Sequence, residues 1–313
     1  MKHPFFKVVE GLIKPERLHE GDCVGIIAPA GPPDEKELFN GMDKLKQMKL
    51  TPVPARNLFQ KKMYLAGKDE ERLEDLHSMF LDPAIKAIIC ARGGYGTARL
   101  APYLDYSIIR SNPKVFWGYS DITYLHMAIQ MYSGLVTFHA PMVASDLGKN
   151  DCKIETFHTF SQLFYPHANL FNRFNSTIEV IKSGCGSGRI VGGNLTLLTD
   201  SLGTEFEIST SGRILFFEEV NEPAYRIDAM LTHMKWAGKF ENVCGVVIGD
   251  IKAVKGESEK IRELLYEFFC NAPFPVVRGL EIGHCQPNYG IPLGVQAHLD
   301  TDRISLMIEP GVE

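Results

Sequence analysis

Ser120 stands where a serine hydroxyl could act as a nucleophile. It follows a largely apolar run over 114–119 and precedes a helix-like stretch over 121–130, with Gly118 two residues before it. A buried strand that turns sharply into a helix is the geometry of a nucleophile elbow, in which the hydroxyl projects from a tight corner. The first helix amides then point at the group that the hydroxyl attacks. Serine is also a preferred helix N-cap, so this segment alone leaves a purely structural role open.

A serine nucleophile needs a base, and the base needs an acid that orients it. Glu218 and Glu219 are the acid candidates, because they end an apolar run over 213–217 that is typical of a strand. Adjacent strand residues face opposite sides, so at most one glutamate can easily share a pocket with Ser120. The pattern does not choose between them, and taken alone it is more typical of a solvated strand end with two acidic residues.

His284 is the candidate base. It lies in the irregular, polar segment 280–290, which is typical of a surface loop, where functional residues concentrate. An ordinary surface histidine is the alternative interpretation. The neighbouring Cys285 is a poor candidate for a thiol nucleophile, because sequence neighbours on extended backbone point apart and no helix N-terminus would activate the thiol.

A glycine-rich turn, Arg-Gly-Gly-Tyr-Gly at 92–96, directly follows a strand-like run that ends at Ala91. Closely spaced glycines let backbone amides approach a phosphate or an oxyanion. The turn matches neither G-x-G-x-x-G after a first strand nor a P-loop, so an oxyanion hole shared with the amide after Ser120 is its better use. The sequence has no H-E-x-x-H, no C-x-x-C and no His/Cys cluster at ligand spacing, which predicts that no metal is bound.

The elements that must position these residues alternate between strand and helix in the first half. Strands are predicted at 24–29, 87–91 and 115–119, and helices at 34–50, 69–81 and 121–132. This alternation predicts a parallel sheet with helices on both faces. Ligands gather at the carboxyl ends of the strands in such sheets, and both the glycine-rich turn and Ser120 lie at such ends.

From about 147 to 177 the periodic pattern ends, which predicts a linker or an exposed excursion. Beyond it, strands are predicted at 177–181, 189–191, 246–248, 295–299 and 303–308, the last two antiparallel, with helices at 225–236 and 257–269. The predicted fold class is α/β. An N-terminal parallel-sheet α/β domain over 1–165 carries the serine, and a smaller, sheet-rich α+β domain over 178–313 carries the glutamates and the histidine.

Composition narrows the class of protein. The 313 residues suggest two domains or one large α/β unit, and 45% hydrophobic with 23% charged residues exclude a disordered chain. A net charge of −5, with scattered lysine and arginine, predicts neither nucleic-acid nor membrane-surface binding. Residues 1–10 lack the apolar stretch of a signal peptide, and no run approaches the ~18 apolar residues of a membrane span. The number of cysteines is seven, which is odd and fits a reducing compartment better than a disulfide framework. The sequence therefore predicts a cytoplasmic protein.

Several short motifs, taken in order, resemble the LD-carboxypeptidase family of serine peptidases. This family includes the muropeptide LD-carboxypeptidases and the microcin C immunity peptidases. The motifs are Ala-Pro-Ala-Gly at 28–31, Arg-Gly-Gly-Tyr-Gly at 92–96, Gly-Tyr-Ser-Asp at 118–121, Phe-Glu-Glu-Val-Asn-Glu at 217–222 and Gly-His at 283–284. The resemblance covers about 15–308. The elbow departs from the general G-x-S-x-G pattern, and the first dozen residues match nothing in the family.

The resemblance implies a role for each candidate residue. Ser120 would be the nucleophile and His284 the general base. Glu218 would be the acid that orients the imidazole, because the first acidic residue of the pair matches the glutamate of the family's triad. The family fold places the site at the interface of two domains.

The resemblance further implies an oxyanion hole made by the backbone amides of Gly93, Gly94 and Asp121. It implies a metal-independent carboxypeptidase without cofactor, expected to be a homodimer, that releases the terminal D-alanine of cytoplasmic murein tetrapeptides during cell-wall recycling. One alternative is a microcin C immunity-type peptidase that cleaves an amide in a peptidyl or aminoacyl nucleotide, although the segment 219–223 leans toward the muropeptide branch. Another alternative is a non-catalytic protein that binds a ligand in the interdomain cleft.

Overall fold

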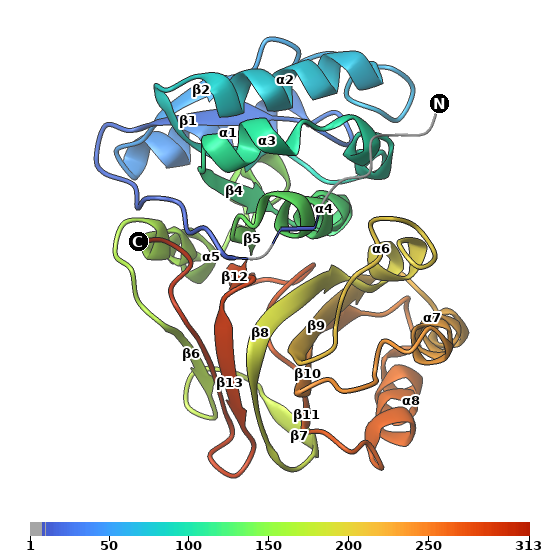
Figure 1. Ribbon diagram of the computed structural model, residues 1–313. Coiled ribbons are helices and arrows are strands. Elements are labelled where there is room, and N and C mark those ends of the chain that lie inside the picture. Colours follow the sequence, from blue (N-terminus) through green and yellow to red (C-terminus); the bar gives the residue numbers. More distant parts are fainter. Residues whose placement is uncertain (1–7, 10) are drawn as a thin grey trace.

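Two sheets, one in each lobe of the molecule, organise the chain in this computed structural model (Figure 1). The structure describes residues 8, 9 and 11–313. The expectation that no signal peptide is present concerns 1–10 and therefore falls mainly outside the described residues. Within the described part of the chain, none of the helices is long and apolar enough to cross a bilayer.

The first lobe contains a six-stranded sheet in the order β12-β5-β4-β3-β1-β2. Five of its strands run parallel and β12 is antiparallel to β5, which confirms the predicted parallel sheet. The strands are β1 (Cys23–Ile27), β2 (Thr51–Pro54), β3 (Ile85–Cys90), β4 (Val115–Gly118), β5 (Thr137–His139) and β12 (Ile291–Leu293). Because β12 comes from near the C-terminus, the chain returns to the first lobe after building the second.

Helices cover this sheet, namely α1 (Glu35–Gln47), α2 (Asp69–Leu81), α3 (Tyr106–Ser111) and α4 (Thr123–Ser133). Asp34 caps α1 by accepting a hydrogen bond from the amide of Glu37, as its position before the periodic stretch predicts. The helix buries Leu38, Met42 and Leu45, one face at helical spacing. Nearly all of α4 is buried, because this helix lies between the two lobes (Figure 1).

The second lobe contains an eight-stranded mixed sheet in the order β6-β14-β13-β8-β9-β10-β11-β7. Its central strands β8 to β11 are parallel, and the flanking pairs are antiparallel, including the predicted β13–β14 pair. The strands are β6 (Asn169–Asn172), β7 (Glu179–Lys182), β8 (Cys185–Asn194), β9 (Arg213–Val220), β10 (Gly245–Lys252), β11 (Val276–Arg278), β13 (Gln296–Asp300) and β14 (Ser305–Ile308). The helices α6 (Leu195–Asp200), α7 (Ala224–Trp236) and α8 (Ser258–Phe269) lie along one side of it (Figure 1).

The stretch 147–177, for which the sequence predicts a linker, contains regular structure. A π-helical turn (η4, Val143–Leu147) leads into α5 (Ile154–His158), a 3₁₀ helix (η5, Thr159–Leu163) and then β6. These pieces are five residues or shorter, too short to show a periodic pattern in the sequence. Phe160 and Leu163 are nonetheless buried in the core. The domain limits at 165 and 178 stay a prediction.

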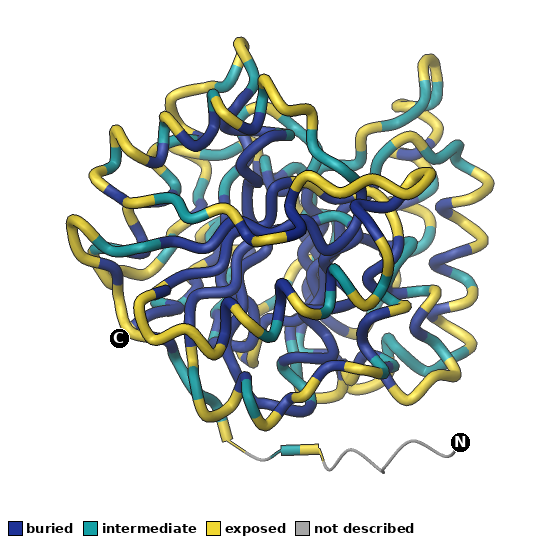
Figure 2. Tube along the Cα trace, turned by 90° about the horizontal axis from the view of Figure 1, so that it is seen from above, coloured by how far each residue is buried: buried dark blue, intermediate teal, exposed yellow. Residues whose placement is uncertain are grey.

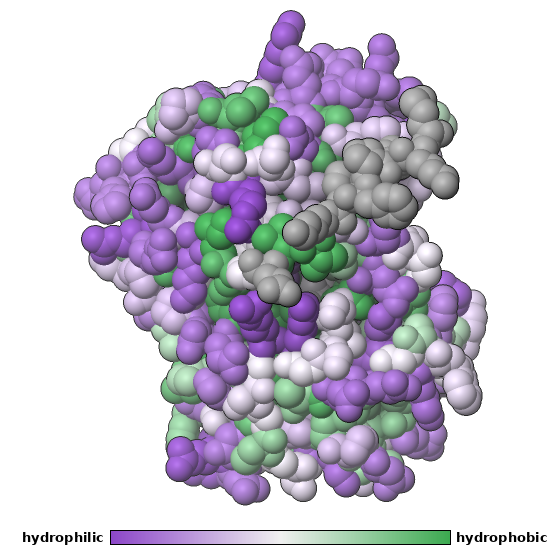
Figure 3. Space-filling model, in the orientation of Figure 1, coloured by the Kyte–Doolittle hydropathy of each residue, from purple (hydrophilic) through white to green (hydrophobic). Residues whose placement is uncertain are grey.

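The core is continuous from one lobe to the other. Figure 2 shows buried backbone through the middle of the molecule, with exposed loops at its rim. Apolar surface gathers at the waist between the lobes, whereas their outer faces are mostly hydrophilic (Figure 3). At this waist α4, which follows β4 in the chain, packs against β8, the neighbour of β9. The carboxyl ends of β4 and β9 therefore both lie at the waist.

Candidate active site

Ser120 lies at a strained corner between β4 and α4. Its φ of 65° is in the left-handed region, which a residue with a side chain adopts at an energetic cost. The chain leaves β4 at Gly118, where a Cβ would come within 2.9 Å of the Cys90 side chain. A 3₁₀ turn, η3 (Ser120–Ile122), precedes the α-helix. This conformation holds the hydroxyl out from the end of the sheet, as in a nucleophile elbow.

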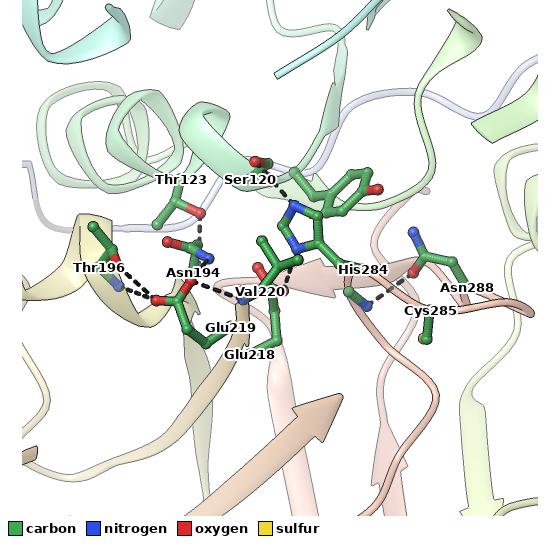
Figure 4. Close-up of polar contacts among 12 residues, drawn as sticks. Ser120, Thr123, Asn194, Thr196, Glu218, Glu219, Val220, His284, Cys285 and Asn288 are labelled. Atoms are coloured by element: carbon green, nitrogen blue, oxygen red, sulfur yellow. Dashed lines mark hydrogen bonds and ion pairs between the residues drawn. The ribbon is translucent and has the colours of Figure 1, made fainter. Parts of the chain in front are cut away.

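The three side chains of the candidate triad form one hydrogen-bonded row (Figure 4). Nε2 of His284 is 3.1 Å from Oγ of Ser120, and Nδ1 of His284 is 2.7 Å from Oε2 of Glu218. Glu218 comes from β9 and is fully buried, and His284 comes from the loop before β12. The geometry allows the imidazole to accept the serine proton at Nε2 while Nδ1–H remains bound to the carboxylate.

The loop that carries His284 is held tightly, although its composition predicts a surface loop. The side chain of His284 is 19% exposed. Gly283 has a φ of 119°, and a Cβ there would lie 2.6 Å from the Glu218 carboxylate, so only glycine fits. The backbone amide of Gly283 donates to the side-chain Oδ1 of the buried Asn288, and the backbone amide of Asn288 donates to Oγ1 of Thr156. These two bonds hold the loop in place and so help to fix the imidazole.

Glu219 faces the opposite way and serves the structure of the second lobe. Its carboxylate accepts hydrogen bonds from the side chain of Asn194, from the amide and hydroxyl of Thr196, and from the amide of Val220 (Figure 4). It therefore binds the N-terminal turn of α6. The alternation of the strand thus separates the two glutamates, and Glu218 is the one that lies next to His284.

Negative charge around His284 favours its protonated form. Burial by itself disfavours an imidazolium, but the charge and hydrogen bond of Glu218, with further charge from Asp146, raise the pKa of His284 above its usual value. Burial raises the pKa of Asp146, which accepts hydrogen bonds from Tyr119 Oη at 3.1 Å and from the amide of Met142 at 2.9 Å. The Tyr119 ring also packs against the imidazole, with 4.8 Å between centroids.

The glycine-rich turn lies directly against the serine. A Cβ on Gly93 would lie 2.8 Å from Cβ and 2.9 Å from Oγ of Ser120. The carbonyl of Gly93 accepts from the amide of Gly31 at 3.0 Å, and Gly94 has a φ of 126° that favours glycine. Asp121 is buried, and its carboxylate accepts from the amide of Thr97 at 2.9 Å, which ties the first turn after Ser120 to the end of the glycine-rich turn.

Several residues around the site gave no signal in the sequence. Arg72 is buried, and its guanidinium donates to the carbonyls of Pro29 and Gly96, so it clamps the two loops that flank the serine. Tyr119, His139, Asp146 and Asn288 are also buried at the site. They lie singly in strands, helices or loops of ordinary composition, and only the fold brings them together.

Other chemistry finds little support among the described residues. Burial raises the pKa of the Cys285 thiol far above its usual range, and its Sγ donates to the carbonyl of Pro287, so the thiolate needed for attack is disfavoured. Within 8, 9 and 11–313, no group of three or more His, Cys, Asp or Glu side chains is arranged to hold a metal ion.

Together, the two lobes define an α/β fold, and the Ser120–His284–Glu218 row has the arrangement of a Ser-His-acid triad. Comparison with known families agrees. The model of the LD-carboxypeptidase N-terminal domain matches residues 24–140, and that of the LD-carboxypeptidase C-terminal domain matches residues 187–299. The chain therefore belongs to the LD-carboxypeptidase family, which confirms the resemblance found in the sequence. Family membership and the carboxypeptidase names of its relatives support a peptidase of the serine carboxypeptidase type.

Individual relatives span nearly the whole chain. A probable murein peptide carboxypeptidase from Bacillus subtilis (strain 168) is 42% identical, over 96% of this chain and 95% of that protein. The microcin C7 self-immunity protein MccF from Escherichia coli is 26% identical, over 93% and 94%. Among solved structures, a muramoyltetrapeptide carboxypeptidase from Oxalobacter formigenes is similar with a TM-score of 0.81 and 28% identity, over 91% of this chain and 97% of that one.

Proposed function

We propose that the protein is a serine carboxypeptidase that hydrolyses an L,D-peptide bond and releases the terminal D-alanine of murein tetrapeptides in the cytoplasm. The observation that carries this proposal is the continuous hydrogen-bonded row from Ser120 through His284 to the buried Glu218. The name of the B. subtilis relative, a probable murein peptide carboxypeptidase, supports the choice of substrate.

In the proposed reaction, Oγ of Ser120 attacks the carbonyl carbon of the scissile bond while Nε2 of His284 takes the hydroxyl proton. Glu218 stabilises the imidazolium and keeps Nδ1 protonated. The backbone amides of Gly93, Gly94 and Asp121 would stabilise the oxyanion. One such donor typically contributes ~2.7–4 kcal/mol to lowering the barrier.

The tetrahedral intermediate collapses when His284 returns the proton to the leaving nitrogen. The C–N bond breaks, D-alanine leaves with a free amine, and the shortened peptide stays bound as an ester of Ser120. Water then attacks the ester with His284 again as base, which releases the peptide carboxylate and restores the serine hydroxyl. The strained φ of Ser120 favours this role, because it keeps the hydroxyl at the corner throughout the cycle.

A groove beside the glycine-rich turn supports the approach of a peptide. It is lined by Gly31, Tyr64, Gly94 and Tyr95 together with Arg92. Because Gly94 follows the glycine that touches Ser120, a chain lying in this groove would lead to the hydroxyl.

A microcin immunity-type activity is the second candidate, because MccF is a relative along nearly the whole chain. In this case the same serine would cleave the amide of an aminoacyl nucleotide. The higher identity to the murein peptide carboxypeptidase, 42% against 26%, favours the muropeptide reaction.

The test is to incubate the protein with murein tetrapeptide and to detect tripeptide and D-alanine by mass. We expect Ser120→Ala to abolish release with unchanged folding, and Ser187→Ala, in β8 of the second lobe, to keep the wild-type rate. A wild-type rate in Ser120→Ala would refute the serine mechanism. Cleavage of an aminoacyl-sulfamoyl adenosine in place of the tetrapeptide would favour the immunity reaction. Tight muropeptide binding without cleavage, and without labelling by a fluorophosphonate, would indicate a binding protein.

A further inference from the structure

His139 is a fully buried histidine at the end of β5 that the proposed reaction does not use. Its ring lies nearly edge-on to the rings of Tyr119 and Phe216, at 5.6 and 5.1 Å between centroids. Its Nε2 lies 3.8 Å from Oε1 of Glu218, whereas the other carboxylate oxygen accepts the bond from His284. His139 therefore faces the far side of the candidate triad acid.

Polar atoms meet at this contact without any other partner. Among the described residues, the two ring nitrogens of His139 have no hydrogen-bond partner, and Oε1 of Glu218 has none either. A buried carboxylate oxygen is costly unless a donor faces it. A neutral imidazole carries one N–H and one lone pair. At 3.8 Å the two atoms are too far apart for a direct hydrogen bond, but a proton on Nε2 faces the negative charge of Oε1, whereas the other tautomer sets a lone pair against it. The contact therefore favours the Nε2–H form.

Burial favours the neutral form of the two imidazoles behind Glu218, His139 and His126. Burial lowers the pKa of His139 well below its usual value, and positive charge on His126 or His284 lowers it further. Burial also lowers the pKa of His126 to about 4, and its Nε2 donates to the carbonyl of Gly118 at 2.8 Å. A neutral donor leaves the full negative charge of Glu218 for His284, whereas a lysine or arginine in this place would cancel it.

We propose that His139 is a positioning residue whose Nε2–H faces Oε1 of Glu218 and orients the carboxylate, so that Oε2 accepts from His284. This inference rests on the proposed function, because it takes His284 as the base. It assigns the fully buried β5 histidine a specific task at the site, beyond packing among aromatic rings.

The other titratable groups that act on this pair are three carboxyl groups, the buried Tyr119 hydroxyl and the Cys285 thiol. Asp146 from η4, Glu219 from β9 and Asp250 from β10 are buried or partly buried, and burial raises the pKa of each. They add negative field at Glu218 or His284 and do not supply a donor to Oε1. Removing the imidazole N–H of His139 therefore tests a single contact.

The experiment compares two substitutions of His139 with a matched control. His139→Phe keeps a buried ring and removes the donor, and His139→Gln restores an amide donor. His126→Gln removes the neighbouring imidazole while keeping a donor for the Gly118 carbonyl. The readouts are kcat and KM for D-alanine release against pH, together with an NMR titration of the His284 imidazole in the free protein.

We expect His139→Phe to lower kcat roughly ten- to a hundredfold with little change in KM. Without the donor, the negative charge of Glu218 acts on His284 uncompensated, so His284 holds its proton more strongly and the acidic limb of the pH profile should move upward by about one pH unit. His139→Gln should recover most of the activity and the wild-type limb, and His126→Gln should leave the limb in place.

A lower kcat with an unmoved limb and an unmoved His284 titration would overturn the inference, since packing alone would explain it. His139→Gln as impaired as His139→Phe would do the same. If His139→Phe does not fold, His139→Met removes the donor with a more adaptable side chain. The NMR titration needs no turnover. A shifted titration in a protein that cleaves no muropeptide would reject the proposed function and keep the role of His139.

Discussion

Replacing Gly93 by alanine would place a methyl carbon against the hydroxyl that we propose to attack the substrate. The new Cβ would lie 2.8 Å from Cβ and 2.9 Å from Oγ of Ser120, with the Met142 side chain at 3.5 Å. Ordinary contact begins at 3.4 Å, so the first distance is short by 3.4 − 2.8 = 0.6 Å. Ser120 cannot easily move away from the new methyl group, because it lies at a strained corner between a buried strand and a buried helix.

The expected loss follows from this displacement. A misplacement of about 1 Å in an active site can lower the rate about 10²-fold, and loss of one oxyanion donor costs about 10²–10³-fold in kcat. A shift of more than half an ångström at the nucleophile or at the turn should therefore lower kcat/KM by about 10²-fold. Stability should change less, by about 1–3 kcal/mol, as for other overpacked sites.

The assay is D-alanine release from murein tetrapeptide by Gly93→Ala, with the thermal midpoint measured on the same preparation. Gly212→Ala is the control, because a Cβ there meets nothing within 4 Å while its φ of 70° makes the substitution strained. This control should lose stability and keep its kcat/KM. If Gly93→Ala turned over the substrate at the wild-type rate, the glycine-rich turn could not be packed against the attacking hydroxyl as described.

Two further predictions concern pH. Glu218 and nearby acids raise the pKa of His284 above 6.5, and His284 must be neutral to act as the proposed base. We therefore expect kcat/KM to rise with pH, with a midpoint above pH 6.5. A profile that is already flat at pH 6 would contradict this. Burial lowers the pKa of His126 from 6.5 to about 4, so the unfolded chain binds this proton first as pH falls. The contribution of His126 to the free energy of unfolding is therefore fully present above pH 6.5 and is lost as the pH falls from 6.5 to 4. At about 1.4 kcal/mol per pH unit, this loss amounts to about 3 kcal/mol. Urea unfolding of His126→Gln should show a shallower acid loss than wild type.

Local sequence patterns located most of the elements that position the site. The helix predicted at 69–81 is α2 (Asp69–Leu81), because its apolar positions at helical spacing bury one face. The apolar strand that ends in two glutamates is β9, and strand alternation limited the site to one of them. The choice of Glu218 came from the resemblance, since no local pattern says which face of a strand meets a serine a hundred residues earlier.

Non-local contacts were beyond the sequence pattern. The strand β12 (Ile291–Leu293) joins the first sheet, yet three residues carry no period that could reveal it. His139 pairs with Ile291 in this sheet and faces Glu218 from the second lobe, and neither neighbour is close to it in sequence. The loop of His284 is polar enough to predict exposure. In the fold it is held inside, because polar groups of the loop find hydrogen-bond partners there.

The segment of His284, the proposed base, is fixed to both lobes, and this explains how three distant residues can hold one geometry. Beyond His284, the chain pairs through β12 with β5, and the amide of Gly290 donates to Oγ1 of Thr159 at 2.8 Å, so the loop is fixed to the part of the chain that precedes the second sheet. Glu218 reaches the imidazole from β9 of the second sheet. A row of side chains that is held from both sides needs no lobe closure to assemble. The row is therefore preorganised, and substrate binding has only to bring a carbonyl carbon to the corner at Ser120.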